Sequence, residues 1–105
     1  MSDDVSVRDN EAESRYEIYV DGKRAGFTEY AQHGDVMDLL HTEVADEYGG
    51  RGLATELIRA TLDDARTRGR HVLPYCPFVK GFLAKNPDYA DLVPIEQRSR
   101  FGLAI

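Results

Sequence analysis

The sequence of 105 residues has one cysteine, no tryptophan and no apolar run of the about 18 residues that a membrane-spanning helix needs. One cysteine excludes an internal disulfide, and the lack of a signal peptide or spanning segment predicts a cytoplasmic protein with no membrane partner. Basic residues are also scarce, since 13 Lys and Arg stand against 19 Asp and Glu. The net charge of −6 and the lack of basic clusters interleaved with aromatics argue against nucleic acid as a partner. We expect no metal site, and a monomer or weak dimer.

The charge is unevenly distributed along the chain. Residues 1–50 contain four Lys and Arg against 13 Asp and Glu, whereas residues 51–105 contain nine against six. A basic second half favours a polyanionic ligand, and an acidic first half attracts a cationic amine. Ordinary solvated surface is an equally acceptable interpretation of the same distribution.

The first half of the chain predicts an antiparallel meander. Residues 1–14 are polar and acidic, and we expect them to form a flexible N-terminus. Residues 16–20 alternate as in a half-buried strand, and the following Asp21-Gly22 is a strong hairpin signal. A return strand is expected at residues 24–30. A longer strand follows at residues 36–44, either unbroken or in two pieces joined by a bulge.

The second half predicts a helix, a short strand and a second helix. Apolar or small residues recur at helical spacing from Gly52 to Arg68, and Gly69 is well placed to cap the helix. Residues 71–74 are expected to form a strand, which a helical crossover places parallel to the strand ending near Val44. A shorter helix is expected at residues 78–85.

Together these elements predict an α/β (α+β) fold with a mixed sheet. The expected order is an antiparallel N-terminal meander, a central helix after a glycine turn, a parallel strand and a short C-terminal helix. We expect one domain at residues 15–93, between the flexible N-terminus and a C-terminal tail at residues 94–105 that carries no clear pattern.

The glycine turn before the central helix, Gly49-Gly50-Arg51-Gly52-Leu53-Ala54, is the most informative stretch of the chain. The first amides of a helix lack intrahelical acceptors, and glycines there let an anionic group approach the backbone closely. A Walker-type loop is excluded because no Gly-Lys-Ser/Thr is present. The dinucleotide fingerprint is excluded because Thr55 occupies the place of its third glycine. The turn therefore predicts a phosphate site of another kind.

The turn resembles the motif Gln/Arg-x-x-Gly-x-Gly/Ala of the GNAT acetyltransferase superfamily, whose members hold the pyrophosphate of acetyl-CoA there. The motif glycines fall on Gly50 and Gly52, while Glu47 occupies the leading Gln/Arg position and departs from the motif. The resemblance covers most of residues 16–93. Within the superfamily, the sequence is similar to the minimal, single-domain GNAT-like group with a cysteine after the post-helix strand. The further segments that carry it are His41-Thr42-Glu43-Val44, Tyr75-Cys76-Pro77-Phe78 and Asn86-Pro87-Asp88-Tyr89.

This resemblance implies a GNAT-like mixed sheet and acetyl-CoA, or coenzyme A, as the cofactor. The pantetheine arm is then expected in a wedge between the strand before the turn and the strand after the helix, where backbone amides of Glu43, Val44 and Ala45 are left free. Lys80 and Lys85 are candidates to meet the adenosine phosphates, or are plain surface. The predicted cofactor-binding residues are Val44, Ala45, Gly49, Gly50, Arg51, Gly52, Leu53 and Ala54.

Transfer of an acetyl group to an amine requires that the amine be uncharged. Deprotonating an amine of pKa near 10.4 at pH 7 costs ~4.6 kcal/mol, so a base or a desolvating pocket is needed. Glu43 and His41 are two apart in the predicted strand and share a face, and Glu43 is the preferred base. The alternative interpretation is a solvated carboxylate beside a packed or capping imidazole.

Cys76 is the third predicted catalytic residue, on the resemblance to the minimal group. As a thiolate it would accept the acetyl group or touch the thioester, and otherwise it is an inert packing residue. GNAT enzymes often use a tyrosine of the last helix as the acid, but Gly81-Phe82-Leu83 offers no hydroxyl there. That departure leaves Tyr75, Tyr89 or solvent as the acid, with Tyr89 also suited to anchoring a loop.

The predicted function is that of a small acetyl-CoA-dependent N-acetyltransferase, with direct transfer preferred over an acyl intermediate on Cys76. The acceptor is expected to be a primary amine in an open cleft: a protein lysine, a polyamine or another small amine. The alternative is a non-catalytic acyl-CoA-binding or interaction module, which Glu47 and the missing helix tyrosine favour. A purely structural glycine turn without a ligand is a third possibility.

Overall fold

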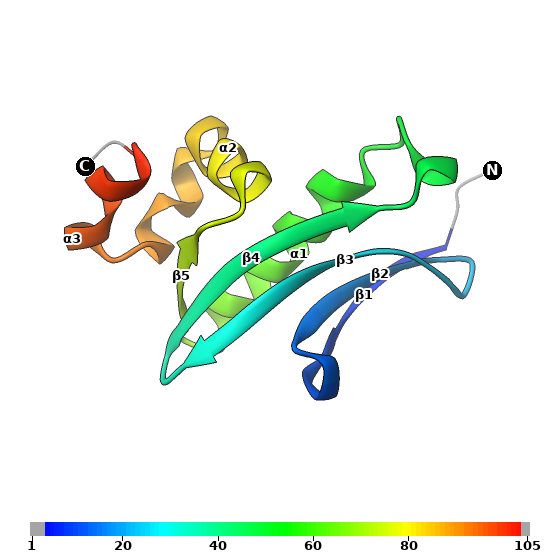
Figure 1. Ribbon diagram of the computed structural model, residues 1–105, viewed down its shortest axis with the longest axis horizontal. Coiled ribbons are helices and arrows are strands. Elements are labelled where there is room, and N and C mark those ends of the chain that lie inside the picture. Colours follow the sequence, from blue (N-terminus) through cyan, green and yellow to red (C-terminus); the bar gives the residue numbers. More distant parts are fainter. Residues whose placement is uncertain (1–3, 104–105) are drawn as a thin grey trace.

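The computed structural model describes residues 4–103, which form one five-stranded mixed sheet with helices packed on one of its faces (Figure 1). The strand order is β1-β2-β3-β4-β5, with antiparallel pairing from β1 to β4 and parallel pairing of β4 with β5. This confirms the predicted α+β fold. The strands and helices are β1 (Val5–Asn10), β2 (Arg15–Val20), β3 (Lys23–His33), β4 (Val36–Val44), α1 (Leu53–Thr67), β5 (His71–Pro74), α2 (Pro77–Lys85) and α3 (Ile95–Arg98), and the 3-10 turns are η1 (Glu11–Glu13), η2 (Asp46–Tyr48), η3 (Pro87–Leu92) and η4 (Ser99–Phe101).

Tight glycine turns connect the strands of the meander. Asp21 and Gly22 join β2 to β3 with positive φ angles of 50° and 83°, the conformation that a two-residue hairpin turn requires. Gly34 has a φ of 63° in the turn between β3 and β4. The predicted meander is confirmed, although β3 is longer than the expected strand at residues 24–30.

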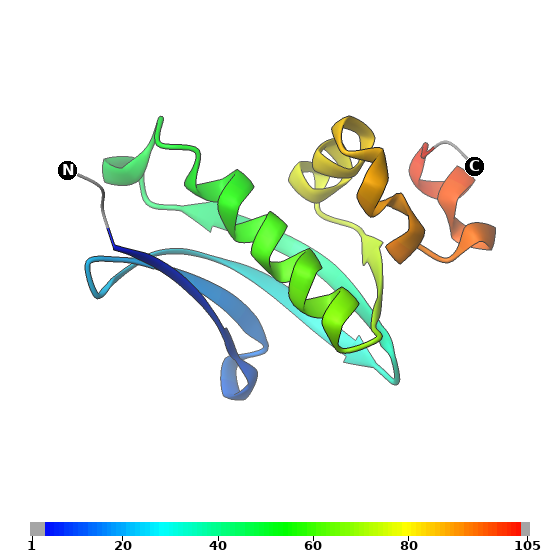
Figure 2. The same cartoon turned by 180° about the vertical axis from the view of Figure 1, so that it is seen from behind.

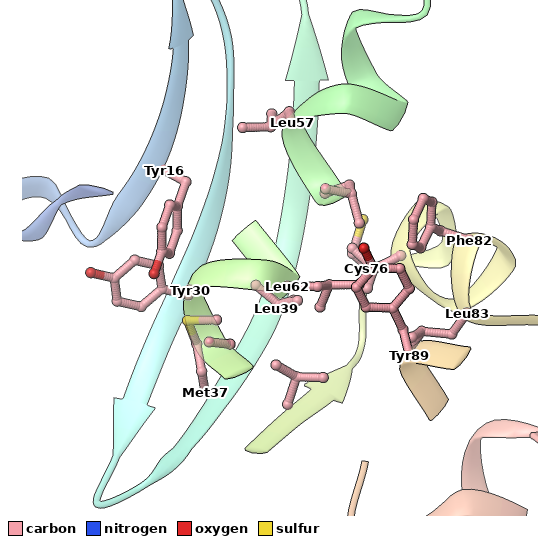
Figure 3. Packing of buried hydrophobic residues seen from close by; sticks show 14 of the residues in the cluster. Tyr16, Tyr30, Met37, Leu39, Leu57, Leu62, Cys76, Phe82, Leu83 and Tyr89 are labelled. Atoms are coloured by element: carbon pink, nitrogen blue, oxygen red, sulfur yellow. The ribbon is translucent and has the colours of Figure 1, made fainter. Parts of the chain in front are cut away.

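Helix α1 crosses one face of the sheet, which we call the inner face (Figure 2). The helix ends where Gly69 takes a φ of 69°, and the amide of Arg70 donates to the carbonyl of Ala65 at 2.8 Å, as the predicted C-cap requires. In the core, Leu62 of α1 lies near Leu39 of β4, and Leu57 lies farther along the helix (Figure 3). The buried residues of α1 are Leu53, Leu57, Ile58, Thr61, Leu62 and Ala65.

The prediction of a flexible N-terminus over residues 1–14 is wrong for residues 5–13. Val5 to Asn10 pair with β2 as an edge strand, and Val5 and Val7 pack against the core. The carboxylate of Asp9 accepts a hydrogen bond from the Tyr30 hydroxyl at 2.6 Å and lies 3.3 Å from the Arg68 guanidinium. Long-range partners therefore order a segment whose own composition is polar. Residues 1–3 lie outside the described part of the chain.

The unassigned C-terminal segment packs onto the domain. Within residues 94–103 the chain forms α3 and η4, and the side chains of Phe101 and Leu103 are buried in the core. The ring of Phe101 meets Tyr75 edge-on at 5.3 Å between centroids. These residues therefore belong to the same packed body as β5 and α2.

A bulge in β4 decides which of its side chains face the helices. The register between β3 and β4 shifts from Tyr30/Leu39 to Glu29/His41, which leaves Leu40 as an extra residue. Met37 and Leu39 are fully buried under the helices, and beyond the bulge it is Thr42 that faces inward. The observed β4 is thus one continuous strand with a bulge, which combines the two predicted forms.

The outer face of the sheet carries no helix within residues 4–103, but it holds a buried carboxylate (Figures 1 and 2). Glu17 is 1% exposed and accepts hydrogen bonds from Arg15 at 2.7 Å, from the Tyr19 hydroxyl at 2.7 Å and from Asn10 at 3.2 Å. Burial by itself raises the pKa of Glu17, but these hydrogen bonds outweigh it and lower the pKa to about 2.

A Glu17→Gln variant is expected to be less stable than the wild type at neutral pH but not in acid. Because the folded-state pKa lies below the unfolded one, the charged carboxylate stabilises the native state above about pH 4.5, and this contribution is lost as the pH falls toward about 2. In urea unfolding at pH 7, the free energy of unfolding of the variant should be about 2–3 kcal/mol lower than that of the wild type. This difference should become much smaller by about pH 2.5. A difference of equal size at both pH values would contradict this account.

Candidate functional site

The strands β4 and β5 separate partway along β4. They pair only from Val36 to Leu39 opposite His71 to Pro74, and the last link is the Cys76 amide, which donates to the Leu39 carbonyl at 2.8 Å. Beyond that link the chain turns into α2 while β4 continues alone on this side (Figure 1). The expected wedge between the two strands is therefore present.

Only one of the three amides expected to be free faces this wedge. The Ala45 amide donates to the Ala25 carbonyl of β3 at 2.8 Å, so the expectation of a free amide fails there. Backbone groups of an antiparallel strand alternate in direction, so Glu43 also faces β3, while Val44 faces the wedge. A close approach of β3 supports this arrangement, because a Cβ on Gly26 would clash with the Glu43 carbonyl oxygen.

The glycine turn presents unbonded amides at the start of α1. Gly50 and Gly52 have φ angles of 79° and 72°, and Gly52 is the N-cap of the helix without a side-chain cap. The first helical donor is the Glu56 amide, which bonds to the Gly52 carbonyl at 3.1 Å. Within residues 4–103, the amides that donate to no backbone carbonyl include those of Gly50, Gly52, Leu53, Ala54 and Thr55. A helix start of this kind favours an anion.

Two neighbouring cavities lie between the glycine turn and the end of α2. One of about 240 Å³ is lined by Val44 of the wedge, by Tyr48 and Phe78, and by the turn residues Gly49, Gly50, Gly52, Leu53, Ala54 and Thr55. The next, of about 320 Å³, shares Thr55 and Phe78 with it and reaches Lys85 and Asn86. The two cavities therefore lie side by side, from the wedge past the start of α1 to a lysine.

The other predicted cofactor-binding residues and Lys80 differ in their contacts and in the cavities that they line. Gly49 lines the cavity, but its amide already donates to the Asp46 carbonyl at 3.0 Å. The Arg51 guanidinium lies 5.6 Å from the ring centre of Tyr48. Lys80 lines a separate cavity of about 280 Å³ between α2 and the C-terminal segment.

A larger cavity of about 520 Å³ lies under the C-terminal segment, away from the glycine turn. Its charged groups are already engaged: Asp91 receives two hydrogen bonds from Arg66 at 2.7 and 2.9 Å, and Arg98 donates to the Val93 carbonyl at 2.9 Å. The smaller cavity at the glycine turn, with its unbonded amides, is the better candidate for an anionic ligand.

The structure brings two of the three predicted catalytic residues together. The Nε2 atom of His41 lies 2.9 Å from Oε2 of Glu43, and both side chains are more than half exposed on the outer face. Strand alternation predicted their shared face, and the contact confirms it.

Cys76 lies on the other side of β4. It is 4% exposed at the N-cap of α2, and its Sγ lies 3.4 Å from the Thr42 hydroxyl, which is itself 2.9 Å from the Thr28 hydroxyl (Figure 3 shows Cys76 in the core). Thr42 and Thr28 did not emerge from the sequence analysis, because the bulge that turns Thr42 inward carries no local signal. Cys76 and Glu43 therefore do not form one cluster.

Two tyrosines remained as candidate acids. The Tyr89 hydroxyl donates to Asp63 at 2.7 Å, and this hydrogen bond, with burial, raises the pKa of Tyr89. Tyr75 is 43% exposed at the end of β5, and its hydroxyl accepts a hydrogen bond from Arg100 at 2.9 Å. Tyr89 is thus a packing anchor, whereas Tyr75 stays accessible.

Two structural features bear on other classes of site. Within residues 4–103, no helix is long and apolar enough to cross a membrane. The same residues contain no group of three or more His, Cys, Asp or Glu arranged to hold a metal ion.

Comparison with known proteins places this fold and site in a family. Residues 15–92 match the GCN5-related N-acetyl-transferase family. The curated relatives called Protein NATD1 from Bos taurus and Homo sapiens are 38% and 36% identical over 52 residues, which cover 50% of this chain and 46% of each relative. The chain therefore spans about half the length of the curated relatives it matches.

A solved structure shows the same fold. The solution NMR structure of a GCN5-like protein from Staphylococcus aureus aligns with a TM-score of 0.65 at 24% identity, covering 85% of this chain and 87% of that chain. The family match extends over most of the sequence and includes the glycine turn, the wedge and α2. The chain belongs to the GCN5-related N-acetyltransferase (GNAT) family.

Proposed function

We propose that this protein transfers an acetyl group from acetyl-CoA to a primary amine. The observation that carries the proposal is the position of the unbonded amides of the glycine turn, which line the same cavity as Val44 at the wedge. A ligand that spans this cavity has its anionic part at the start of α1 and its other end between β4 and β5. That arrangement matches a pyrophosphate joined to a pantetheine arm.

The residues present fit the cofactor along this path. Amides of Gly50, Gly52, Leu53 and Ala54 would hold the pyrophosphate, and the positive end of the α1 dipole adds to the attraction. The backbone of Val44 would bond to the pantetheine arm. Lys85, at the far end of the second cavity, would meet an adenosine phosphate.

Bound acetyl-CoA supplies a thioester whose carbonyl carbon accepts the nitrogen lone pair, with formation of the C–N bond and loss of the C–S bond. Glu43 takes the proton that the amine must give up, directly or through one water. His41, 2.9 Å from Glu43, orients that carboxylate. Tyr75 is 43% exposed and precedes Cys76 in the chain, and it or solvent returns a proton to the departing sulfur.

The position of Cys76 supports direct transfer. Its thiol is buried on the inner face and contacts the Thr42 hydroxyl, while the His41–Glu43 pair that would remove its proton lies on the outer face. Cys76 is therefore proposed to shape the floor of the wedge, not to carry the acetyl group.

A Gly52→Ala variant should weaken CoA binding, whereas a Gly69→Ala variant of similar stability should not. Both Gly52 and Gly69 have φ near 70°, and a Cβ at either meets no atom within 4 Å, so Gly69→Ala is a matched control with a similar stability cost of about 1–2 kcal/mol. Calorimetric titration with CoA should show at least about tenfold weaker binding for Gly52→Ala alone, as expected when about 1.4 kcal/mol of amide contact is disturbed. Equal affinities for both variants would reject the phosphate cradle.

A Glu43→Gln variant should lose about 10²-fold or more in kcat at neutral pH, because the amine loses its base. Glu47→Gln, at an exposed carboxylate of the nearby η2 turn, serves as the control and should keep the wild-type rate. The deficit of Glu43→Gln should shrink as the pH approaches the amine pKa near 10.4, where the free amine forms without help. The assay is acetylation of an amine panel followed by mass spectrometry. A deficit that stays constant with pH would argue against a base.

A Cys76→Ala variant should change kcat less than about fivefold, which corresponds to about 1 kcal/mol of barrier. Intact-protein mass spectrometry after mixing with acetyl-CoA should show no acetyl group on the wild-type Cys76. A turnover loss above a hundredfold together with an acetylated cysteine would establish the covalent route instead. CoA binding without acetylation of any amine would leave the non-catalytic acyl-CoA-binding module as the function.

A further inference from the structure

The outer face of the sheet carries a row of side chains that leads away from Glu43. Glu43 on β4 is the register partner of Phe27 on β3, Phe27 is the partner of Glu17 on β2, and Glu17 is the partner of Arg8 on β1. Because partners in adjacent strands lie ~4.8 Å apart, Phe27 is one strand spacing from the proposed base and Glu17 is two. No helix within residues 4–103 covers this row.

Two guanidinium groups flank Phe27 in this row. The Cζ atoms of Arg15 and Arg24 lie 5.0 and 6.0 Å from the Phe27 ring centre, and both arginines approach the same Oε2 atom of Glu17, at 2.7 and 3.5 Å. One buried carboxylate therefore faces these two cations, and Arg8 approaches its other oxygen at 3.9 Å. Arg15 is mostly covered, with 20% of its side chain exposed, whereas Arg24 has 47% exposed. Of the two arginines that flank Phe27, Arg24 is the one that is more accessible to an incoming anion.

The arginines and the His41–Glu43 pair are joined by direct contacts. The rings of Phe27 and His41 are 6.3 Å apart in an edge-to-face arrangement, and His41 contacts Glu43. The face also carries the exposed Glu29, which is the register partner of both Arg15 and His41. Glu43 and Arg24 are both accessible, and they stand on the adjacent strands β4 and β3.

From this arrangement we infer that the acceptor is a primary amine that also carries a carboxylate, with Arg24 as the residue that recognises the carboxylate. The inference rests on the proposed function, because it takes Glu43 as the site of the amine. A separation of about one to two strand spacings, ~5–10 Å, fits the four-carbon stem of a lysine, with its nitrogen at Glu43 and its anionic end at Arg24. The carboxylate comes either from a free amino acid or from an acidic residue beside a lysine in a polypeptide.

The test compares acceptors that differ only in the carboxylate. Nα-acetyl-lysine and its amide share the amine and the stem, and two lysine peptides with a neighbouring glutamate or glutamine represent the polypeptide source. The wild type should bind and acetylate the carboxylate form of at least one pair about three- to fivefold better, which is the range for an ion pair at a half-exposed arginine. A preference for the carboxylate form in the Nα-acetyl-lysine pair indicates that the acceptor is a small molecule. A preference for the glutamate peptide alone indicates that the acceptor is a polypeptide.

The Arg24→Gln variant should bring that ratio to about one while leaving the amide form unaffected. Arg8→Gln is the matched control, because Arg8 is 70% exposed on β1, the strand farthest from Glu43 in the row, and it should keep the wild-type ratio. Equal use of both forms by the wild type, or an Arg24→Gln loss that is the same for both, overturns the inference.

Binding and turnover are measured separately, so that the two proposals fail in different ways. Acceptor binding is followed by NMR chemical-shift titration of the CoA-saturated protein, which needs no chemistry. A carboxylate preference in binding that Arg24→Gln removes, without acetylation, supports the recognition site and rejects the transferase. Acetylation without a carboxylate preference supports the transferase and rejects this recognition site.

Discussion

Pairing between β4 and β5 stops at Leu39, and the site depends on that stop. The chain turns away from β4 after Pro74, because the Tyr75 amide donates to the Leu73 carbonyl of its own strand at 3.1 Å, and Pro77 then begins α2. The Cys76 amide makes the final link, and the bulge at Leu40 bends β4 at the same level. The edge of β4 that is left unpaired then opens beside the start of α1, where the glycine turn lies. A longer β5 would close this edge with hydrogen bonds and remove the wedge.

One strand serves both sides of the proposed reaction because it alternates. Thr42 and Val44 contribute to the inner side, next to Cys76 and the cavity of the glycine turn. His41 and Glu43 point to the outer side, which no helix within residues 4–103 covers. In the proposed reaction the cofactor and the acceptor would therefore approach the wedge from opposite faces and would not compete for space. This division also explains why the only thiol and the proposed base are not neighbours.

Sequence reasoning succeeded where the signal is local. The Asp21-Gly22 turn, the buried stripe of α1 and the cap at Gly69 each depend on residues close in the chain, and each is present as predicted. It failed for β1, because Asp9 is ordered by Arg68, which is 59 residues away. The inward position of Thr42 was not predicted. In a regular strand Thr42 would face outward, and only the bulge turns it toward the helices. The pairing of His41 with Glu43 was predictable because both lie beyond the bulge, where alternation holds.

The uneven charge of the sequence does not become two oppositely charged halves in space. Asp9 of the first half lies within ion-pair distance of Arg68 and Arg70 of the second half, and Glu17 is enclosed by Arg15 and Arg24. These carboxylates are used to hold the sheet together and to fix the arginines in place, so they contribute little attraction for an amine. Glu29 and Glu43 keep accessible carboxylates on the outer face, and Glu43 is the one that lies at the wedge. In the proposed reaction, the local arrangement of charge on this face, more than the total of −6, would therefore set which amine the site prefers.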